Sequence, residues 1–107
     1  MNVGDNLVKI VPEGGSVSGY TPYFTTQAEL EKALESGENL ADVFGLPRAS
    51  ESLSYSVFQI QATASTDVFV SVVAPTVEGS IERSGGALQY IIPDRGQWSN
   101  PVFLRDI

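Results

Sequence analysis

The 107-residue chain has no cysteine and no histidine. Without cysteine it can form no disulfide, no thiolate metal site and no cysteine nucleophile. Without histidine it lacks the usual general base of catalytic triads and of metal-free ribonucleases. Acid-base chemistry would therefore fall to carboxylates, tyrosines, Lys9 or Lys32. These absences disfavour triad hydrolases and leave no candidate metal ligands of the His/Cys kind, so we expect no metal site.

Basic residues are also scarce, with six Lys and Arg against thirteen Asp and Glu and a net charge of -7. This balance opposes nonspecific binding to nucleic acid, which depends on Lys and Arg neutralising phosphates. The sequence has no run of about 18 apolar residues, so we expect no membrane-spanning helix. Residues 1–5 lack the basic-then-apolar layout of a signal peptide. No glycine-rich loop ends in Lys-Ser or Lys-Thr, which disfavours a P-loop.

Length and composition predict a single globular domain over residues 1–107. Hydrophobic residues make up 42% of the chain and charged residues 18%, as in ordinary folded proteins. A chain of this length can bury one modest core.

Alternating and continuous apolar runs predict about five or six short strands and one or two short helices. We expect an α+β fold with a compact, largely antiparallel sheet and the helices between the first and third strands. Residues 62–66 should join two strands as a hairpin, with the second strand inside the sheet, and 74–80 should be a surface loop. The strands are predicted at residues 7–11, 23–25, 55–61, 67–73, 88–92 and 102–104.

Helix signals are clear at two places. Thr26 and Glu29 match a capping box in which each side chain satisfies a backbone N–H of the other residue. This predicts a helix through Ser36 that Gly37 ends in the left-handed conformation. Asn39 and the Gly45-Leu46-Pro47 segment predict a second helix of one or two turns.

A glycine pair, Gly85-Gly86, leads into the short strand that contains Gln89. Period-two alternation places Gln89 and Ile91 on one face of this strand. A polar side chain on a half-buried face needs a hydrogen-bond partner, either in the protein or in a ligand. Two interpretations stay open: a bulge with a satisfied amide, or a cleft that the glycines open beside Gln89.

The order of these features resembles the ADP-ribosyltransferase superfamily, specifically its small NAD-consuming bacterial toxin domains of the tuberculosis necrotizing toxin type. The resembling features are a first strand with a basic residue, an aromatic-Thr-Thr step into a helix, and a later Gly-Gly-x-x-Gln-Tyr strand. They span most of the chain. The resemblance implies an ADP-ribosyltransferase-like fold and a single catalytic domain that takes NAD as its substrate.

The resemblance also implies a site. Gln89 would act at the scissile bond between nicotinamide and ribose. The NAD-binding residues would be Lys9, Tyr23, Thr25, Thr26, Gly85, Gly86 and Tyr90. Lys9 stands where the family usually has Arg or His, and Gln89 stands where arginine-directed transferases have Glu, with Ala87 in place of their second carboxylate. The expected activity is therefore that of an NAD glycohydrolase or an unusual ADP-ribosyltransferase.

The resemblance further implies delivery into a target cell as the end of a larger secreted protein, action in the cytoplasm, and a cognate immunity protein as partner. Two other classes remain. An acidic, noncatalytic binding module, such as an immunity or adaptor protein, would suit the charge. A histidine-free RNase toxin would suit the size but not the charge.

Overall fold

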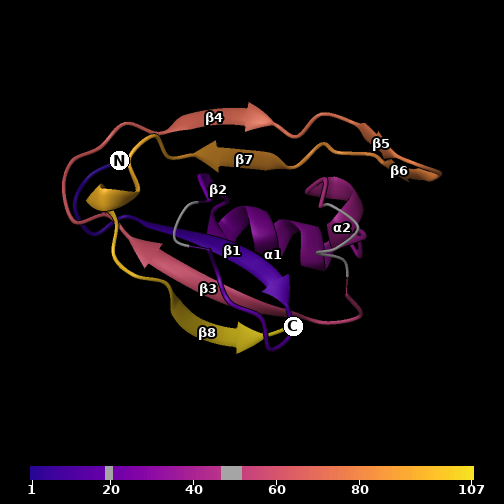
Figure 1. Cartoon of the computed structure of the whole chain (residues 1–107), viewed down its shortest axis with the longest axis horizontal. Helices are drawn as coiled ribbons and strands as arrows, with labels where there is room; N and C mark the ends of the chain where they lie inside the picture. The colour runs from indigo at the N-terminus through magenta and orange to yellow at the C-terminus, as the bar shows by residue number, and fades with distance from the viewer. Residues whose placement is uncertain (19–20, 47–51) are drawn as a thin grey trace.

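The computed structural model describes residues 1–18, 21–46 and 52–107. Within these ranges the chain forms eight strands, two α-helices and one short 3-10 helix, η2 (Figure 1). The elements in order are β1 Asn6–Pro12, β2 Tyr23–Phe24, α1 Gln27–Glu35, α2 Leu40–Val43, β3 Tyr55–Gln61, β4 Phe69–Val72, β5 Thr76–Glu78, β6 Ile81–Arg83, β7 Leu88–Ile91, η2 Arg95–Gln97 and β8 Val102–Asp106.

The strands form three antiparallel sheets, ordered β1-β3-β8, β2-β7-β4 and β5-β6. An antiparallel bridge between Val8 and Thr25 joins the first two, through backbone hydrogen bonds of 2.7 and 2.9 Å. Neighbouring strands therefore follow the order β4-β7-β2-β1-β3-β8. The expected antiparallel α+β fold is confirmed, with two more strands than the upper expectation and more than one sheet.

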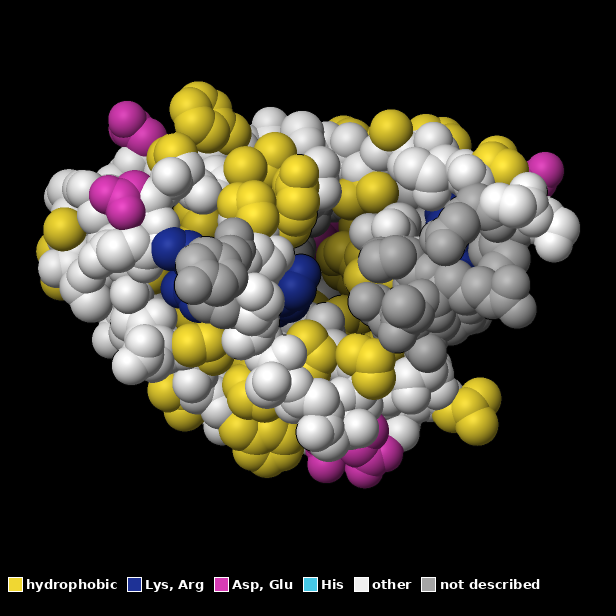
Figure 2. Space-filling view, viewed as in Figure 1, with side chains coloured by type: hydrophobic (Ala, Val, Ile, Leu, Met, Phe, Trp, Pro, Cys, Tyr) yellow, Lys and Arg dark blue, Asp and Glu magenta, His cyan; other side chains and the backbone are white. Residues whose placement is uncertain are grey.

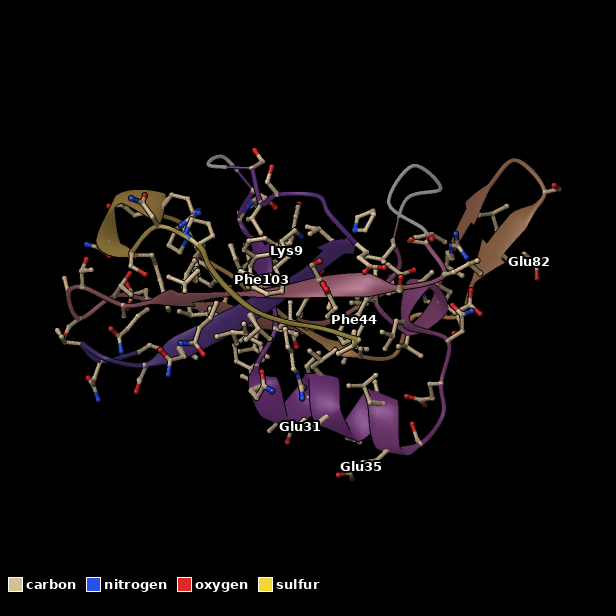
Figure 3. All side chains as sticks on the ribbon, turned by 90° about the horizontal axis from the view of Figure 1, so that it is seen from below. Lys9, Glu31, Glu35, Phe44, Glu82 and Phe103 are labelled. Carbon is tan, nitrogen blue, oxygen red and sulfur yellow. The ribbon has the colours of Figure 1, made fainter. Side chains whose placement is uncertain are left out.

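Strand β1 is the centre of the core because both of its faces are buried. Leu7 and Val8 are fully buried, and alternation along the strand sends their side chains to opposite faces. Leu7 belongs to a cluster with Phe24 and other buried residues. Val8 belongs to a second cluster with Leu30 of α1. Lys9 shares the Leu7 face, and Figure 3 shows it on the side of the sheet away from α1.

Both predicted helices are present where their capping residues indicate. The Thr26 hydroxyl accepts a hydrogen bond of 3.1 Å from the N–H of Glu29 at the start of α1. Gly37 follows the helix with a φ of +70°, the left-handed conformation that glycine adopts without steric cost. Asn39 caps α2 through a bond from the N–H of Asp42. None of the described helices is long and apolar enough to cross a membrane.

Two expectations about the second half of the chain are wrong. Strands β3 and β4 do not form a hairpin, since β3 pairs with β1 and β8 whereas β4 pairs with β7. Strand β4 is an edge rather than an interior strand, and Phe69, Val70 and Val72 are 60, 53 and 60% exposed. Its apolar composition indicates a strand but does not reveal how many neighbours the strand has.

The expected surface loop at 74–80 is also wrong, because it contains strand β5, which pairs with β6 as a hairpin. Figure 1 shows this hairpin extending beyond the body of the molecule. Arg83, at its end, is buried and donates to the Leu46 carbonyl and to Asp42. The hairpin is thus fastened to the end of α2, although its three-residue strands are too short to give a clear alternation pattern.

Candidate functional site

A cavity of about 60 Å³ lies where β1, β2 and β7 meet. Figure 2 shows the molecule hollowed near the middle of one face, with apolar walls and dark blue basic side chains beside the hollow. Elements far apart in the sequence contribute to the cavity, from the first strand to the seventh. Its lining residues are Val8, Lys9, Ile10, Tyr23, Phe24, Thr25, Leu30, Phe44, Leu46, Val73 and Gln89.

Four of the eight residues predicted for the site line this cavity: Lys9, Tyr23, Thr25 and Gln89. They meet because the strands that carry them are consecutive neighbours, β7 beside β2 and β2 beside β1. The sequence separates Lys9 from Gln89 by most of the chain. The fold therefore assembles the basic, aromatic, hydroxyl and amide groups in one place.

Gln89 is half-buried, and its side-chain nitrogen Nε2 donates a hydrogen bond of 3.0 Å to the Ser71 hydroxyl. The two residues are directly opposite each other in the β4-β7 pair. This bond fixes the amide while its oxygen Oε1 accepts no hydrogen bond from the described residues. Gln89 therefore lines the cavity with a structural partner for its nitrogen and an unused acceptor oxygen.

Lys9 is half-buried, and its Nζ donates to the backbone carbonyl of Tyr23 at 3.1 Å. The same ammonium lies 5.9 Å from the centroid of the Phe24 ring, within cation–π range. Burial removes water from the ammonium and lowers the pKa of Lys9 from its ordinary value. No carboxylate of the described residues forms an ion pair with Lys9, so its charge is compensated only by a carbonyl dipole and a ring face.

Thr25 is buried, and its hydroxyl donates to the carbonyl of Leu88 at 2.9 Å. This bond connects the residue that follows β2 to the residue that precedes Gln89. Tyr23, in contrast, is 52% exposed at the rim of the cavity. The two residues thus differ in what they can do: Thr25 holds the strands together, and Tyr23 offers a ring to solvent or to a ligand.

The other four predicted residues do not line this cavity. Thr26 caps α1, and Tyr90 packs against the core cluster around Phe24. Gly85 and Gly86 line a separate hollow of about 120 Å³ beside α1. A Cβ at Gly85 would lie 2.3 Å from the carbonyl oxygen of Val73, so the close approach of two backbone segments accounts for this glycine.

Sequence reasoning missed two polar partners of β7. Ser71 binds Gln89, as described above. Glu29 accepts a hydrogen bond of 3.0 Å from the Leu88 N–H through its carboxylate oxygen Oε1, in addition to donating its own N–H to Thr26. The predicted capping box is therefore half correct, because the Glu29 carboxylate binds β7 and not the N–H of Thr26. The capping-box pattern correctly indicated that Glu29 lies at the start of the helix, but it did not indicate the hydrogen bond to Leu88.

The described residues contain no group of three or more His, Cys, Asp or Glu side chains that could hold a metal ion. Larger hollows exist, such as one of about 530 Å³ near the β5-β6 hairpin, but that hollow contains none of the predicted site residues. The chain matches no protein-family model, no curated protein and no solved structure. The residues around the cavity are therefore the basis for inferring a function.

Proposed function

We propose that this domain consumes NAD by cleaving the bond between nicotinamide and ribose, as a member of the ADP-ribosyltransferase-like superfamily, and that water is the favoured acceptor. The observation that supports this proposal most is the meeting of Lys9, Tyr23, Thr25 and Gln89 at one cavity. These residues occupy the strand-one, strand-two and late-strand positions that the family resemblance implies for an NAD site.

The chemistry suits a site without histidine. When the C–N bond breaks, its electron pair leaves with nicotinamide, which departs as a neutral molecule and needs no general acid. The ribose carbon becomes oxocarbenium-like, water adds to it, and the surplus proton passes to solvent. Such a transition state is stabilised mainly by hydrogen bonds to the ribose hydroxyls. The Oε1 atom of Gln89 can accept one of these bonds without titrating.

The size of the cavity limits how NAD can bind. Ligand pockets for molecules of drug size have volumes of about 300–1,000 Å³, whereas this cavity has about 60 Å³. Most of the dinucleotide must lie outside it, across the rim that carries Tyr23 and Lys9. We assign the nicotinamide end to the cavity because Gln89 and Thr25 are there.

The biological setting belongs to the same proposal. The resemblance supports a toxin domain that is delivered into a target cell as part of a larger secreted protein and acts in the cytoplasm, with a cognate immunity protein as its inhibitor. Hydrolysis is favoured over arginine modification because Ala87 occupies the position of the second carboxylate.

The test is to incubate the purified domain with NAD and to measure released nicotinamide by chromatography. We expect release that depends on Gln89, with Gln61→Ala as the matched control. Gln61 is also a strand glutamine with one side-chain hydrogen bond, to the Gly4 carbonyl at 3.2 Å, but it does not line the cavity. Nicotinamide release no faster than in a protein-free sample would favour the acidic binding module instead.

A further inference from the structure

Two cations lie against the ring of one buried phenylalanine. Phe24 is only 4% exposed. The Lys9 ammonium is 5.9 Å from its centroid, and the Arg95 guanidinium carbon Cζ is 5.4 Å from the same point. Lys9 belongs to β1 and Arg95 to η2, the short 3-10 helix that follows β7. The two charges are therefore brought together by the fold and not by proximity in sequence.

Neither cation has an anionic partner among the described residues, whereas Arg83 forms an ion pair with Asp42. This is unexpected in a chain with more than twice as many acidic as basic residues. Burial lowers the pKa of both Lys9 and Arg95, because each charged group loses water. Two like charges at one ring, both partly desolvated, are costly unless an anion binds between or beside them.

The guanidinium of Arg95 also makes few hydrogen bonds with the described residues. Its Nε is buried and has no hydrogen-bond acceptor in the described part of the chain. Its Nη1 donates to the Ser99 carbonyl at 3.5 Å, the long limit for such a bond. A planar guanidinium can offer paired donors to a phosphate, whereas an ammonium acts as a point charge.

We propose that Arg95 and Lys9 together bind the pyrophosphate of the dinucleotide. This inference deepens the NAD-consuming function proposed above and rests on it for the identity of the ligand. Lys9 marks the rim of the cavity that receives the nicotinamide end, and Arg95 supplies the forked donor that Lys9 lacks. Both side chains contact the ring of Phe24, which supports them before the ligand arrives.

A purely structural role for Arg95 is the competing explanation, in which its cation–π contact fastens η2 onto the core. The two roles respond differently to Arg95→Lys. This change keeps a cation near Phe24 but removes the forked donor set. If Arg95 only holds η2 on the core, stability should be largely preserved. If Arg95 binds phosphate, the affinity for phosphate should fall. Arg105→Ala is the matched control, since Arg105 is an exposed arginine on β8 that does not line the cavity.

The experiment is calorimetric titration with inorganic pyrophosphate at low ionic strength, with a thermal melt of each protein. We expect binding by the parent protein, affinity losses of about tenfold or more for Arg95→Ala and for Lys9→Ala, a smaller loss for Arg95→Lys, and a change within about twofold for Arg105→Ala. Arg95→Lys should melt close to the parent protein.

The proposal is overturned if the parent protein does not bind pyrophosphate at millimolar concentration, or if Arg95→Ala and Arg95→Lys both bind like the parent. Equal losses in Arg95→Ala and Arg105→Ala would also overturn it, because they would indicate general electrostatic attraction. The measurement needs no turnover. Pyrophosphate binding that depends on Arg95 in a protein that releases no nicotinamide would therefore reject the proposed activity while the anion site stands.

Discussion

The carboxylate of Glu29 accepts a hydrogen bond of 3.0 Å from the backbone N–H of Leu88, 59 residues further along the chain. The hydroxyl of Thr25 donates to the carbonyl of the same Leu88. Side chains from the first turn of α1 and from the residue after β2 thus bind both backbone groups of the residue before Gln89. This arrangement fixes the position of β7 relative to β2 and, with it, the direction of the Gln89 side chain into the cavity.

Replacing Glu29 by Ala should leave the Leu88 N–H without its acceptor and lower the free energy of unfolding by about 1–3 kcal/mol. Glu29→Gln should cost less, because an amide oxygen can still accept. Glu31→Ala is the control, since Glu31 is exposed on the same helix and its carboxylate accepts a single hydrogen bond from the described residues, from the Gln27 side chain. Urea denaturation and amide hydrogen exchange at Leu88 measure the effect; an unchanged Leu88 exchange rate in Glu29→Ala would contradict it.

Replacing Gln89 by Ala separates its structural role from its proposed chemical role. The only hydrogen bond of its side chain within the described residues is to Ser71, and both residues are half-buried. Stability should therefore fall by no more than about 0.5–1.5 kcal/mol. Turnover of NAD should fall by a factor on the order of 10², as when one preorganised hydrogen-bonding group is removed. Thermal melts and nicotinamide release on the same preparation test this; turnover per folded molecule that equals the parent value would remove Gln89 from the site.

The contribution of Lys9 to the free energy of unfolding should change with pH in the alkaline range. Because burial lowers its pKa in the folded state below the ordinary value of 10.5, the folded protein releases this proton first as the pH rises. Between the lowered pKa and 10.5 the unfolded chain holds more protons, so stability rises with pH. We expect the parent protein to gain stability relative to Lys9→Met as the pH increases toward 10.5. Denaturant midpoints of both proteins across this range give the slope, and parallel curves would show that Lys9 titrates normally.

The two glycines before β7 should respond unequally to a methyl group. Gly85 has a φ of +66°, and an added Cβ would meet backbone atoms of Val73 and Ala74 at 2.3–2.9 Å. Gly86 also has a positive φ, +101°, but an added Cβ would meet nothing within 4 Å. Gly86→Ala should cost only backbone strain, about 1–3 kcal/mol. Gly85→Ala should cost more because the clash adds overpacking. Comparable melting temperatures for both variants would contradict the close backbone approach.

Local signals in the sequence located the elements well, because they report interactions between residues close in the chain. Thr26 and Asn39 cap their helices as expected, and Gly37 follows α1 in the predicted conformation. The apolar runs at β1 and β3 also became strands. Strand pairing was harder to predict, since the short segment between β3 and β4 is compatible with a hairpin. Only the competing long-range partners, β1 and β8 for β3 and β7 for β4, decide against it.

In the candidate site, too, the individual residues could be predicted from the sequence but their spatial arrangement could not. Lys9, Tyr23, Thr25 and Gln89 could be selected from the sequence because each is a polar or aromatic residue in or beside a predicted strand. Their meeting at one cavity depends on the strand order, which the sequence did not reveal. Arg95 could not be selected because it lies between the predicted strands at 88–92 and 102–104, outside any predicted element, and only its contact with the Phe24 ring relates it to Lys9.

The exposed apolar edge at β4 makes the aggregation of this protein depend on its net charge. An unpaired strand edge with Phe69, Val70 and Val72 in solvent is a template for pairing with the same edge of another molecule. A net charge of -7 makes two copies repel each other at neutral pH. Near the isoelectric point of about 4.3 this repulsion vanishes while the apolar edge is unchanged. Mildly acidic solutions should therefore drive the protein toward edge-to-edge aggregation.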